Sequence, residues 1–293
     1  MNEVKRYLIG ILTFFAILVI LSIAVTLLTI LNLPRFIPNK KLKQILGLFS
    51  NKMGSATVAS ITTSLKILHR LDWDFQIPEN VNTDNWYIAM SNHQSWADIF
   101  ILLAAGHQKI PLLKFFMKQE LRWIPIIYLV HKTIDMPFLN RHSRAEIQAN
   151  PELKIVDSKN AKKAAKRFSR NPSTAFSFAE GTRFSSYKHI AQQSPYPDLL
   201  KPKVGALAIA LSGMPQVETL VDFTVVYASK KRSTWDFLCG DLSKARVVAK
   251  TYSISNDLKN RSFEDEDEYR AKFQKFVDEI WFEKQAMITN LKF

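Results

Sequence analysis

An uncharged apolar stretch near the N-terminus constrains this chain more than any other feature. No Asp, Glu, Lys or Arg occurs from Tyr7 to Leu33, where only scattered Thr, Ser and Asn interrupt apolar residues. About 20 apolar residues suffice to span a bilayer core, whereas the apolar region of a signal peptide has only about 7 to 15 and ends at a small-residue cleavage site. This stretch is longer and ends in Asn-Leu-Pro-Arg. We therefore expect a retained membrane anchor, either spanning the bilayer or lying partly in one leaflet.

Basic residues flank this stretch unevenly. Lys5 and Arg6 precede it, and four cations follow it: Arg35, Lys40, Lys41 and Lys43. By the positive-inside rule, this asymmetry places the bulk of the chain on the cytoplasmic side of the membrane. The whole chain has 40 Lys and Arg against 26 Asp and Glu, a formal net charge of +14. Such a charge favours anionic partners: a lipid surface, nucleic acid or phosphate-bearing substrates.

From residue 73 onward, short apolar strands alternate with amphipathic helices, which is typical of an α/β domain. We expect strands at 73–77, 86–91, 173–179, 220–227 and 246–254, and helices at 96–105, 157–170, 203–211 and 265–288. Residues 41–71 show helical spacing with several lysines, and predict one or two helices that either pack on the domain or rest on anionic headgroups. The prediction is a mixed sheet flanked by helices over residues 73–293, preceded by an anchor and amphipathic segment over 1–72.

The segment at residues 92–98, Asn-His-Gln-Ser-Trp-Ala-Asp, lies between a predicted strand and an apolar helix. Side chains at such a junction lie at the mouth of the sheet, where α/β domains bind their ligands. Asp98 fits a capping box with Ser95 as N-cap, and His93 is then only a polar loop residue. On one continuous helix, His93 and Asp98 would be five positions apart and would not face each other. A non-helical N-cap at Ser95 lets the chain bend, so that Asp98 can reach the imidazole.

A His–Asp pair of this kind suits the transfer of an acyl group to an alcohol. Because a hydroxyl is a poor nucleophile, a neutral imidazole must take its proton as it attacks a thioester carbonyl, and a carboxylate on the other ring nitrogen fixes the tautomer. The thiol is already a good leaving group. We therefore expect no metal and no cofactor beyond the acyl donor, and the single cysteine, Cys239, has no second Cys with which to form a thiolate metal site.

Asn92, His93 and Asp98 resemble the signature of the glycerolipid (1-acylglycerol-3-phosphate) acyltransferase family, in which Asn-His is followed by four residues and Asp. A second family block, Glu-Gly-Thr-Arg, is present at residues 180–183, after the predicted strand at 173–179. Residues 137–141 resemble the family's intermediate block, and residues 201–206 resemble the block in which a basic residue precedes a helix-opening Gly. Two main blocks, each at a strand end and in the family's order, make this resemblance specific. It covers residues 86–227 and the anchor.

The resemblance implies that His93 is the general base and Asp98 its orienting carboxylate. It implies that the polar head of the acceptor is held by Glu180, Gly181, Thr182, Arg183, Arg141 and Lys203. A guanidinium can grip phosphate oxygens through two parallel hydrogen bonds, and Gly181 permits close backbone approach. Because a carboxylate would repel phosphate, Glu180 is expected to orient Arg183 or the loop. Weaker candidates for acceptor contacts are Lys114 and Lys118.

The implied reaction transfers a fatty acyl group from acyl-CoA or acyl-carrier protein to the free hydroxyl of lysophosphatidate, giving phosphatidate at a phospholipid membrane. The predicted strand at 220–227 lacks the proline of many family members, and so looks more like the branch of the lysocardiolipin acyltransferases and the bacterial YihG type. Acylation or remodelling of another lysophospholipid is therefore an alternative. A non-catalytic, membrane-tethered module that binds anionic lipid would explain the charge and the anchor, but not the paired blocks. We expect no nucleic-acid partner, because the sequence lacks an Arg-rich tail or a stacked-aromatic motif.

Overall fold

The computed structural model describes residues 2–118, 123, 128–129, 133–136, 138–139, 149–150, 152–259 and 267–293. The helices are α1 (Glu3–Asn32), α2 (Lys40–His69), α3 (Ala97–Gly106), α6 (Glu152–Ala165), α7 (Ser186–Gln192), α8 (Gly205–Gly213), α9 (Thr234–Leu238) and α10 (Asp267–Leu291). The strands are β1 (Asp72–Gln76), β2 (Tyr87–Ser91), β3 (Leu113–Phe115), β4 (Met117–Lys118), β5 (Phe138–Leu139), β6 (Thr174–Phe178), β7 (Thr219–Tyr227) and β8 (Lys244–Ser253).

A six-stranded sheet with the order β1-β8-β7-β2-β6-β3 forms the centre of the fold. Strands β7, β2, β6 and β3 are parallel to one another, β8 is antiparallel to β7, and β1 is parallel to β8. All five residues of the central strand β2 are buried, as expected of a continuous apolar run between two parallel neighbours. The predicted mixed sheet flanked by helices is thereby confirmed.

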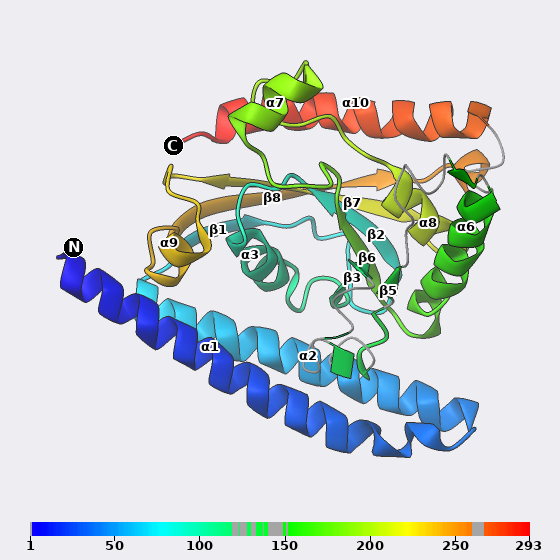
Figure 1. Cartoon of the computed structure of the whole chain (residues 1–293), viewed down its shortest axis with the longest axis horizontal. Helices are drawn as coiled ribbons and strands as arrows, with labels where there is room; N and C mark the ends of the chain where they lie inside the picture. The colour runs from blue at the N-terminus through cyan, green and yellow to red at the C-terminus, as the bar shows by residue number, and fades with distance from the viewer. Residues whose placement is uncertain are drawn as a thin grey trace.

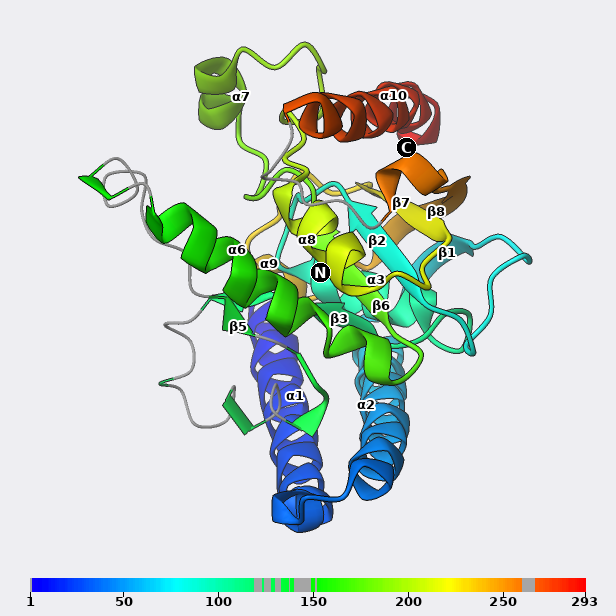
Figure 2. The same cartoon turned by 90° about the vertical axis from the view of Figure 1, so that its right-hand side faces the viewer.

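Helices cover both faces of this sheet (Figures 1 and 2). On one face, α8 and α10 contribute Leu207, Phe273 and Trp281 to a core with the apolar side chains of β2, β6 and β7. On the other face, Ile101 of α3 and Leu65 of α2 pack against apolar side chains of the sheet. The parallel strands are therefore enclosed from both sides, and their carboxyl ends remain as the accessible edge of the domain.

The two N-terminal helices form an antiparallel hairpin below the sheet, which Figure 2 shows as a pair of long helices side by side. Across it, the Thr13 hydroxyl lies 2.8 Å from Nε2 of His69, and Asn32 donates to the Ser50 hydroxyl at 2.9 Å. A 3-10 turn, Leu33–Phe36, joins the two helices. For residues 41–71 we expected one or two helices, and all but the last two residues belong to the single helix α2, which ends at His69 and packs against α1.

Both ends of α1 are tied to the α/β domain. At its N-terminal end, Arg6 forms ion pairs with Asp236 and Asp241, each at 2.7 Å. Just beyond its C-terminal end, Arg35 pairs with Asp135 at 3.0 Å. The helix is therefore held along the domain at both ends.

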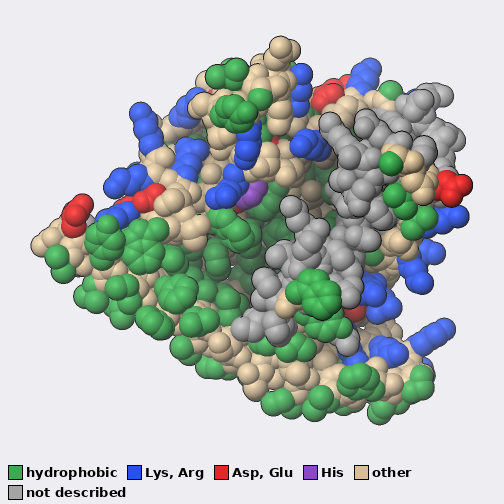
Figure 3. Space-filling model, in the orientation of Figure 1, with side chains coloured by type: hydrophobic (Ala, Val, Ile, Leu, Met, Phe, Trp, Pro, Cys, Tyr) green, Lys and Arg blue, Asp and Glu red, His purple; other side chains and the backbone are tan. Residues whose placement is uncertain are grey.

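The outward face of this hairpin is apolar, and Figure 3 shows hydrophobic side chains covering the lower edge of the molecule along α1. Its exposed large side chains include Leu8, Ile11, Phe15, Leu18, Val19 and Leu27 on α1 and Ile45, Leu48 and Phe49 on α2. By length and composition, Glu3–Phe36 is the one described segment apolar enough to cross a membrane, a test that a signal sequence also passes. This N-terminal helix is accordingly a candidate for membrane anchoring.

Two helix boundaries differ from the prediction. The helix expected at 157–170 begins five residues earlier, because the side chain of Asn150 accepts the backbone N–H of Glu152 and caps the helix. It also ends earlier, and Phe168–Arg170 form a 3-10 turn. The short elements β3, α7 and α9 were not predicted, since segments of three to seven residues carry little periodicity.

Candidate active site

The ends of three parallel strands place the candidate residues together. Strands β2 and β6 pair through Ser91 and Phe178, and β2 and β7 pair through Ser91 and Phe223. Beyond the end of β2, the side chain of Asn92 continues the ladder: its amide donates to the Val225 carbonyl at 2.9 Å and its oxygen accepts the Val225 N–H at 2.8 Å. These two hydrogen bonds to β7 fix the main chain immediately before His93.

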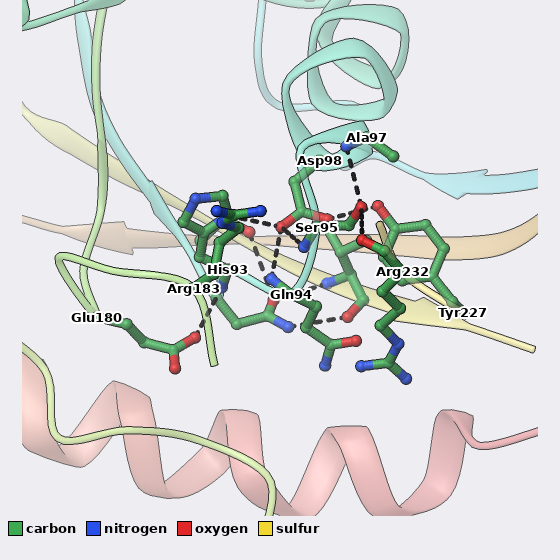
Figure 4. A network of polar contacts seen from close by, with 12 residues as sticks. His93, Gln94, Ser95, Ala97, Asp98, Glu180, Arg183, Tyr227 and Arg232 are labelled. Carbon is green, nitrogen blue, oxygen red and sulfur yellow. Dashed lines mark hydrogen bonds and ion pairs between the residues drawn. The ribbon is translucent and has the colours of Figure 1, made fainter. Parts of the chain in front are cut away.

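His93 and Asp98 form a hydrogen-bonded dyad, with Nδ1 of His93 2.8 Å from Oδ2 of Asp98 (Figure 4). Asp98 is fully buried, and the same oxygen accepts the backbone N–H groups of Gln94 and Ser95 at 2.6 and 3.0 Å. The imidazole stacks on Phe178 with ring centroids 3.8 Å apart. A carboxylate on Nδ1 leaves Nε2 as the basic nitrogen of a neutral ring, as a general base requires.

The bend that brings the dyad together differs in detail from a capping box. The Ser95 N–H does donate to the Asp98 carboxylate, as the box requires. The Ser95 hydroxyl, however, accepts from the N–H of Ala97 at 3.2 Å, not from that of Asp98, and donates to the Arg232 carbonyl at 2.9 Å. The helix proper starts at Ala97, with Trp96 as its N-cap. Expecting Ser95 to be the N-cap of a complete box was therefore wrong, because its hydroxyl also joins the loop after β7.

Tyr227, at the end of β7, is a further member of the site that the sequence did not reveal. Its hydroxyl donates to Oδ1 of Asp98 at 2.5 Å. Burial, followed by the charge of Asp98, raises the pKa of Tyr227 well above its ordinary value, so this phenol stays a donor at every working pH. Asp98 thus accepts four hydrogen bonds, two of them from side chains on different strand ends.

Replacing Tyr227 with Phe is expected to lower kcat about 10-fold, since a net hydrogen bond to a charged group is worth about 1.5 to 3 kcal/mol and only part of this is felt in the transition state. The KM for either substrate should change little, because the phenol faces Asp98. Thiol release during acyl transfer measures both constants. Tyr252→Phe removes a comparable bond to Glu283 far from the dyad and serves as the control. An unchanged kcat in Tyr227→Phe would show that Asp98 is held sufficiently without it.

Glu180 is fully buried and holds the main chain on both sides of the site. One carboxylate oxygen accepts the N–H of His93 at 2.7 Å, and the other accepts the N–H of Leu200 at 2.9 Å. Burial raises the pKa of Glu180 to about 7, against the opposing effect of these two N–H groups. The carboxylate therefore contacts the backbone and not Arg183. We assign it the role of positioning the main chain at His93, and not that of binding a headgroup.

The loop after Glu180 forms a basic rim next to the dyad. Gly181 has a left-handed backbone (φ +68°), and a Cβ there would lie 3.1 Å from Cδ of Lys203, so glycine lets the Lys203 side chain pass close to the loop. The Phe184 N–H donates to the carbonyl of His93 at 2.7 Å, which places the neighbouring Arg183 beside the dyad (Figure 4). In the part of the chain that the structure describes, no carboxylate pairs with the exposed Arg183 guanidinium.

Lys188, on α7, was not predicted as a member of this rim. Its ammonium donates to the Thr182 hydroxyl at 2.7 Å and to the Arg183 carbonyl at 3.0 Å. It therefore clamps the loop while adding a third cation beside Arg183 and Lys203. A Lys–Lys–Arg cluster formed from two separate segments could not be found from sequence spacing. Figure 3 shows Lys and Arg side chains gathered above a hollow with hydrophobic walls.

Arg232 lies on the opposite side of the dyad from Arg183 (Figure 4). Its half-buried guanidinium sits over the Tyr227 ring, 5.7 Å from the centroid, and donates weakly to the Ser229 carbonyl at 3.4 Å. No ion pair joins it to a carboxylate among residues 2–118 and the other described segments. Two guanidinium groups therefore flank His93 and Asp98.

An apolar cavity of about 490 Å³ begins at the amino end of α3, next to the dyad. Trp96, two residues before Asp98, is part of its wall. The wall consists of Leu21, Val25 and Leu28 of α1, Val58 and Ile61 of α2, Trp96, Phe100 and Leu103 around α3, and Leu112, Ile134 and Met136. The cavity therefore lies between the N-terminal hairpin and the domain.

The structure does not bring all sequence candidates to the site. Arg141 lies outside the described residues, as do the side chain of Lys118 and most of the block at 137–141. Lys114 is buried on β3, where burial lowers its pKa to about 8, and the charges that act on it belong to Asp135, Arg35 and Arg170 rather than to the dyad. Its expected contact with the acceptor is therefore not supported.

Comparisons with known proteins identify the family of this chain. Residues 72–244 match the family described as Acyltransferase. Among solved structures, the chain is similar to the 1-acyl-sn-glycerophosphate acyltransferase PlsC from Thermotoga maritima, with 18% sequence identity, a TM-score of 0.57, and coverage of 99% of this chain and 98% of that one. This likeness shows a shared fold that includes the N-terminal hairpin. No curated protein sequence matches the chain. Because the family match covers more than half of its length, the chain belongs to the acyltransferase family.

Proposed function

We propose that this protein transfers a fatty acyl group from acyl-CoA or acyl-carrier protein to the free hydroxyl of lysophosphatidate, giving phosphatidate. The observation that carries this proposal is the position of the His93–Asp98 dyad between the basic rim of Arg183, Lys188 and Lys203 and an apolar cavity. The rim suits a phosphate, and the cavity suits a hydrocarbon chain. The substrates of such a reaction carry both groups.

The chemistry assigned to the dyad needs one proton transfer in each direction. Nε2 of His93 accepts the proton of the acceptor hydroxyl as its oxygen attacks the thioester carbonyl, and Asp98 stabilises the imidazolium that forms. As the tetrahedral intermediate collapses, the carbon–sulfur bond breaks. The thiolate then takes the proton from His93, so a C–O bond replaces a C–S bond and the base is regenerated. Tyr227 and the two backbone N–H groups hold the Asp98 carboxylate in place against His93 throughout.

The acyl chain is proposed to lie in the cavity, with its carbonyl near Trp96 and its tail toward the hairpin. The hairpin thereby serves the active site directly. A chain that enters from the membrane would pass between α1, α2 and α3 without crossing water, which would cost about 0.8 kcal/mol for each exposed CH₂ group.

The anchor is proposed to lie in one leaflet. A helix that spans a bilayer has its ends on opposite sides, whereas both ends of α1 are paired with residues of the catalytic domain, through Arg6 and Arg35. Its exposed apolar face would then dip into the leaflet. With both ends on one side, the six cations that flank the apolar stretch all favour the cytoplasmic side, which we propose for the catalytic domain.

A second acceptor is favoured by Arg232. Lysophosphatidate carries one phosphate, which the rim around Arg183 could hold alone. A second guanidinium across the dyad suits an acceptor with two anionic groups, such as a lysocardiolipin. This alternative matches the branch of the family to which the strand without proline is similar.

The test is a thiol-release assay on the full chain in detergent, with acyl-CoA and acyl-carrier protein as donors and a panel of lysophospholipids as acceptors. The proposal expects thiol release that depends on lysophosphatidate. A preference for lysocardiolipin would instead assign the second acceptor, and Arg232→Ala should then reduce that preference selectively. If no acceptor releases thiol from either donor, while the protein binds anionic vesicles, the non-catalytic module is supported and the proposed function is wrong.

A further inference from the structure

A buried ion pair lies behind the site and takes no part in the chemistry described so far. Lys284 of α10 and Asp222 of β7 are 0% and 2% exposed, with Nζ 2.9 Å from Oδ1. The same ammonium donates to the Phe223 carbonyl at 2.6 Å and to the Thr224 hydroxyl at 3.3 Å. Burial raises the pKa of Asp222 to about 6 and lowers the pKa of Lys284. A buried pair often adds no net stability compared with apolar residues of the same volume, so stability alone is a poor reason for it.

A chain of hydrogen bonds links this face of α10 to His93. Trp281, one turn before Lys284 and on the same face of the helix, donates to the Leu200 carbonyl at 2.9 Å. The N–H of Leu200 donates to Glu180, and the other oxygen of Glu180 accepts the N–H of His93. Lys284 also acts on Glu180 through its charge, which lowers the pKa of that buried carboxyl.

We propose that Lys284 is a positioning residue for acyl transfer: its ammonium fixes β7 at Phe223 and Thr224, next to the residue of β7 that holds the side chain of Asn92 and so the main chain before His93. This inference rests on the proposed function. It explains why a lysine is buried where a methionine would fill the same space. At Glu180, a carboxylate offers two acceptor oxygens to the two N–H groups that it holds, whereas a protonated carboxyl gives up part of that capacity to its own O–H.

The charged groups around Glu180 determine how this device responds to pH. The charge of Lys284 on α10 lowers the pKa of Glu180, and the charge of Asp98 on α3 raises it, while His93 donates its backbone N–H to the carboxylate. Lys203, just before α8, packs against the adjacent Gly181. With its pKa raised to about 7, Glu180 becomes protonated as the pH falls through neutrality. Loss of the Lys284 charge removes an effect that lowers this pKa, so protonation would occur at higher pH. The acid limb of the activity profile is therefore expected to move upward.

The experiment compares three variants of the full chain. Lys284→Met alone would leave Asp222 buried and unpaired and is expected to destabilise the fold, so the main variant is Asp222→Asn combined with Lys284→Met, which removes both charges. Lys284→Arg keeps the positive charge. Lys275→Met changes an exposed lysine on the same helix and is the control.

For the double variant we expect a native circular dichroism spectrum, a kcat reduced about 10-fold, an acceptor KM within about threefold of wild type, and an acid limb at higher pH. Lys284→Arg should keep the acid limb in place. Hydrogen exchange adds a readout independent of activity: peptides that contain His93 and Leu200 should exchange faster in the double variant than in the Lys275→Met control.

A folded double variant with the kcat, pH profile and hydrogen exchange of wild type would overturn the proposal, because Lys284 would then only neutralise Asp222. If the wild-type protein releases no thiol with any acceptor, the proposed function fails on its own. Hydrogen exchange still decides in that case: faster exchange supports the positioning of His93 by Lys284, and unchanged exchange refutes it.

Discussion

Replacing His93 with alanine is expected to lower kcat by about 10²- to 10⁴-fold, the range that a general base contributes. Without Nε2, the acceptor hydroxyl must attack while keeping its proton, or lose it to water. The KM for lysophosphatidate should change much less, because the phosphate is proposed to bind at the rim of Arg183, Lys188 and Lys203. Initial rates of thiol release at saturating donor measure both constants.

The fold should survive this substitution. Asp98 keeps three of its four hydrogen-bond donors, from Tyr227, Gln94 and Ser95, and the backbone N–H of residue 93 still binds Glu180. His107→Ala is a matched control, because it also removes an imidazole that bonds to another side chain, the hydroxyl of Ser55, away from the site. Full activity in a folded His93→Ala protein would eliminate the dyad mechanism.

Some parts of the site could be predicted because they depend on local sequence. His93, Asp98 and Arg183 follow strand ends, and the apolar runs that mark those strands are unambiguous in a buried parallel sheet. Asp98 could be expected to reach His93 because a break in the helix lies within five residues of both. The sheet class followed from the alternation of strands and helices along the chain.

Other parts depend on which segments become neighbours in space. Tyr227 is the last residue of a predicted strand, but its role required knowing that β7 lies next to β2. Lys284 would be assigned to the solvated face of an amphipathic helix, since lysine is almost never fully buried. Its burial follows from the position of α10 over the middle of β7, at Asp222 to Thr224, which no short-range pattern encodes. Glu180 was placed in the right loop, yet its two backbone partners come from segments at residues 93 and 200.

The hairpin illustrates the same limit at the level of whole elements. The sequence predicted an apolar anchor and an amphipathic segment correctly as helices, but the ion pairs of Arg6 and Arg35 join them to residues more than 90 positions away. Helix α1 contributes a wall of the apolar cavity in addition to its proposed contact with lipid.

Replacing Arg183 with alanine is expected to raise the KM for the acceptor about 100-fold with little change in kcat. A charge-assisted hydrogen bond contributes about 1.5 to 3 kcal/mol, and a guanidinium forms two with one phosphate, whereas about 1.4 kcal/mol corresponds to a factor of ten. Because a phosphate away from the reacting carbonyl binds equally in the ground and transition states, the loss should appear in KM. Arg183→Lys should recover part of it, since an ammonium keeps the charge but not the paired geometry.

The acceptor panel makes this experiment specific. Lys275→Ala removes the same charge from an exposed position of α10 and controls for a general weakening of attraction to anionic substrates. With Arg183→Ala, the KM for lysophosphatidate should rise while the KM for acyl-CoA stays near its wild-type value. The reason is that the guanidinium is proposed to bind the acceptor and not the donor. An equal rise for both substrates would instead place the donor's phosphates at the rim, and the acceptor headgroup would then have to bind on the side of Arg232.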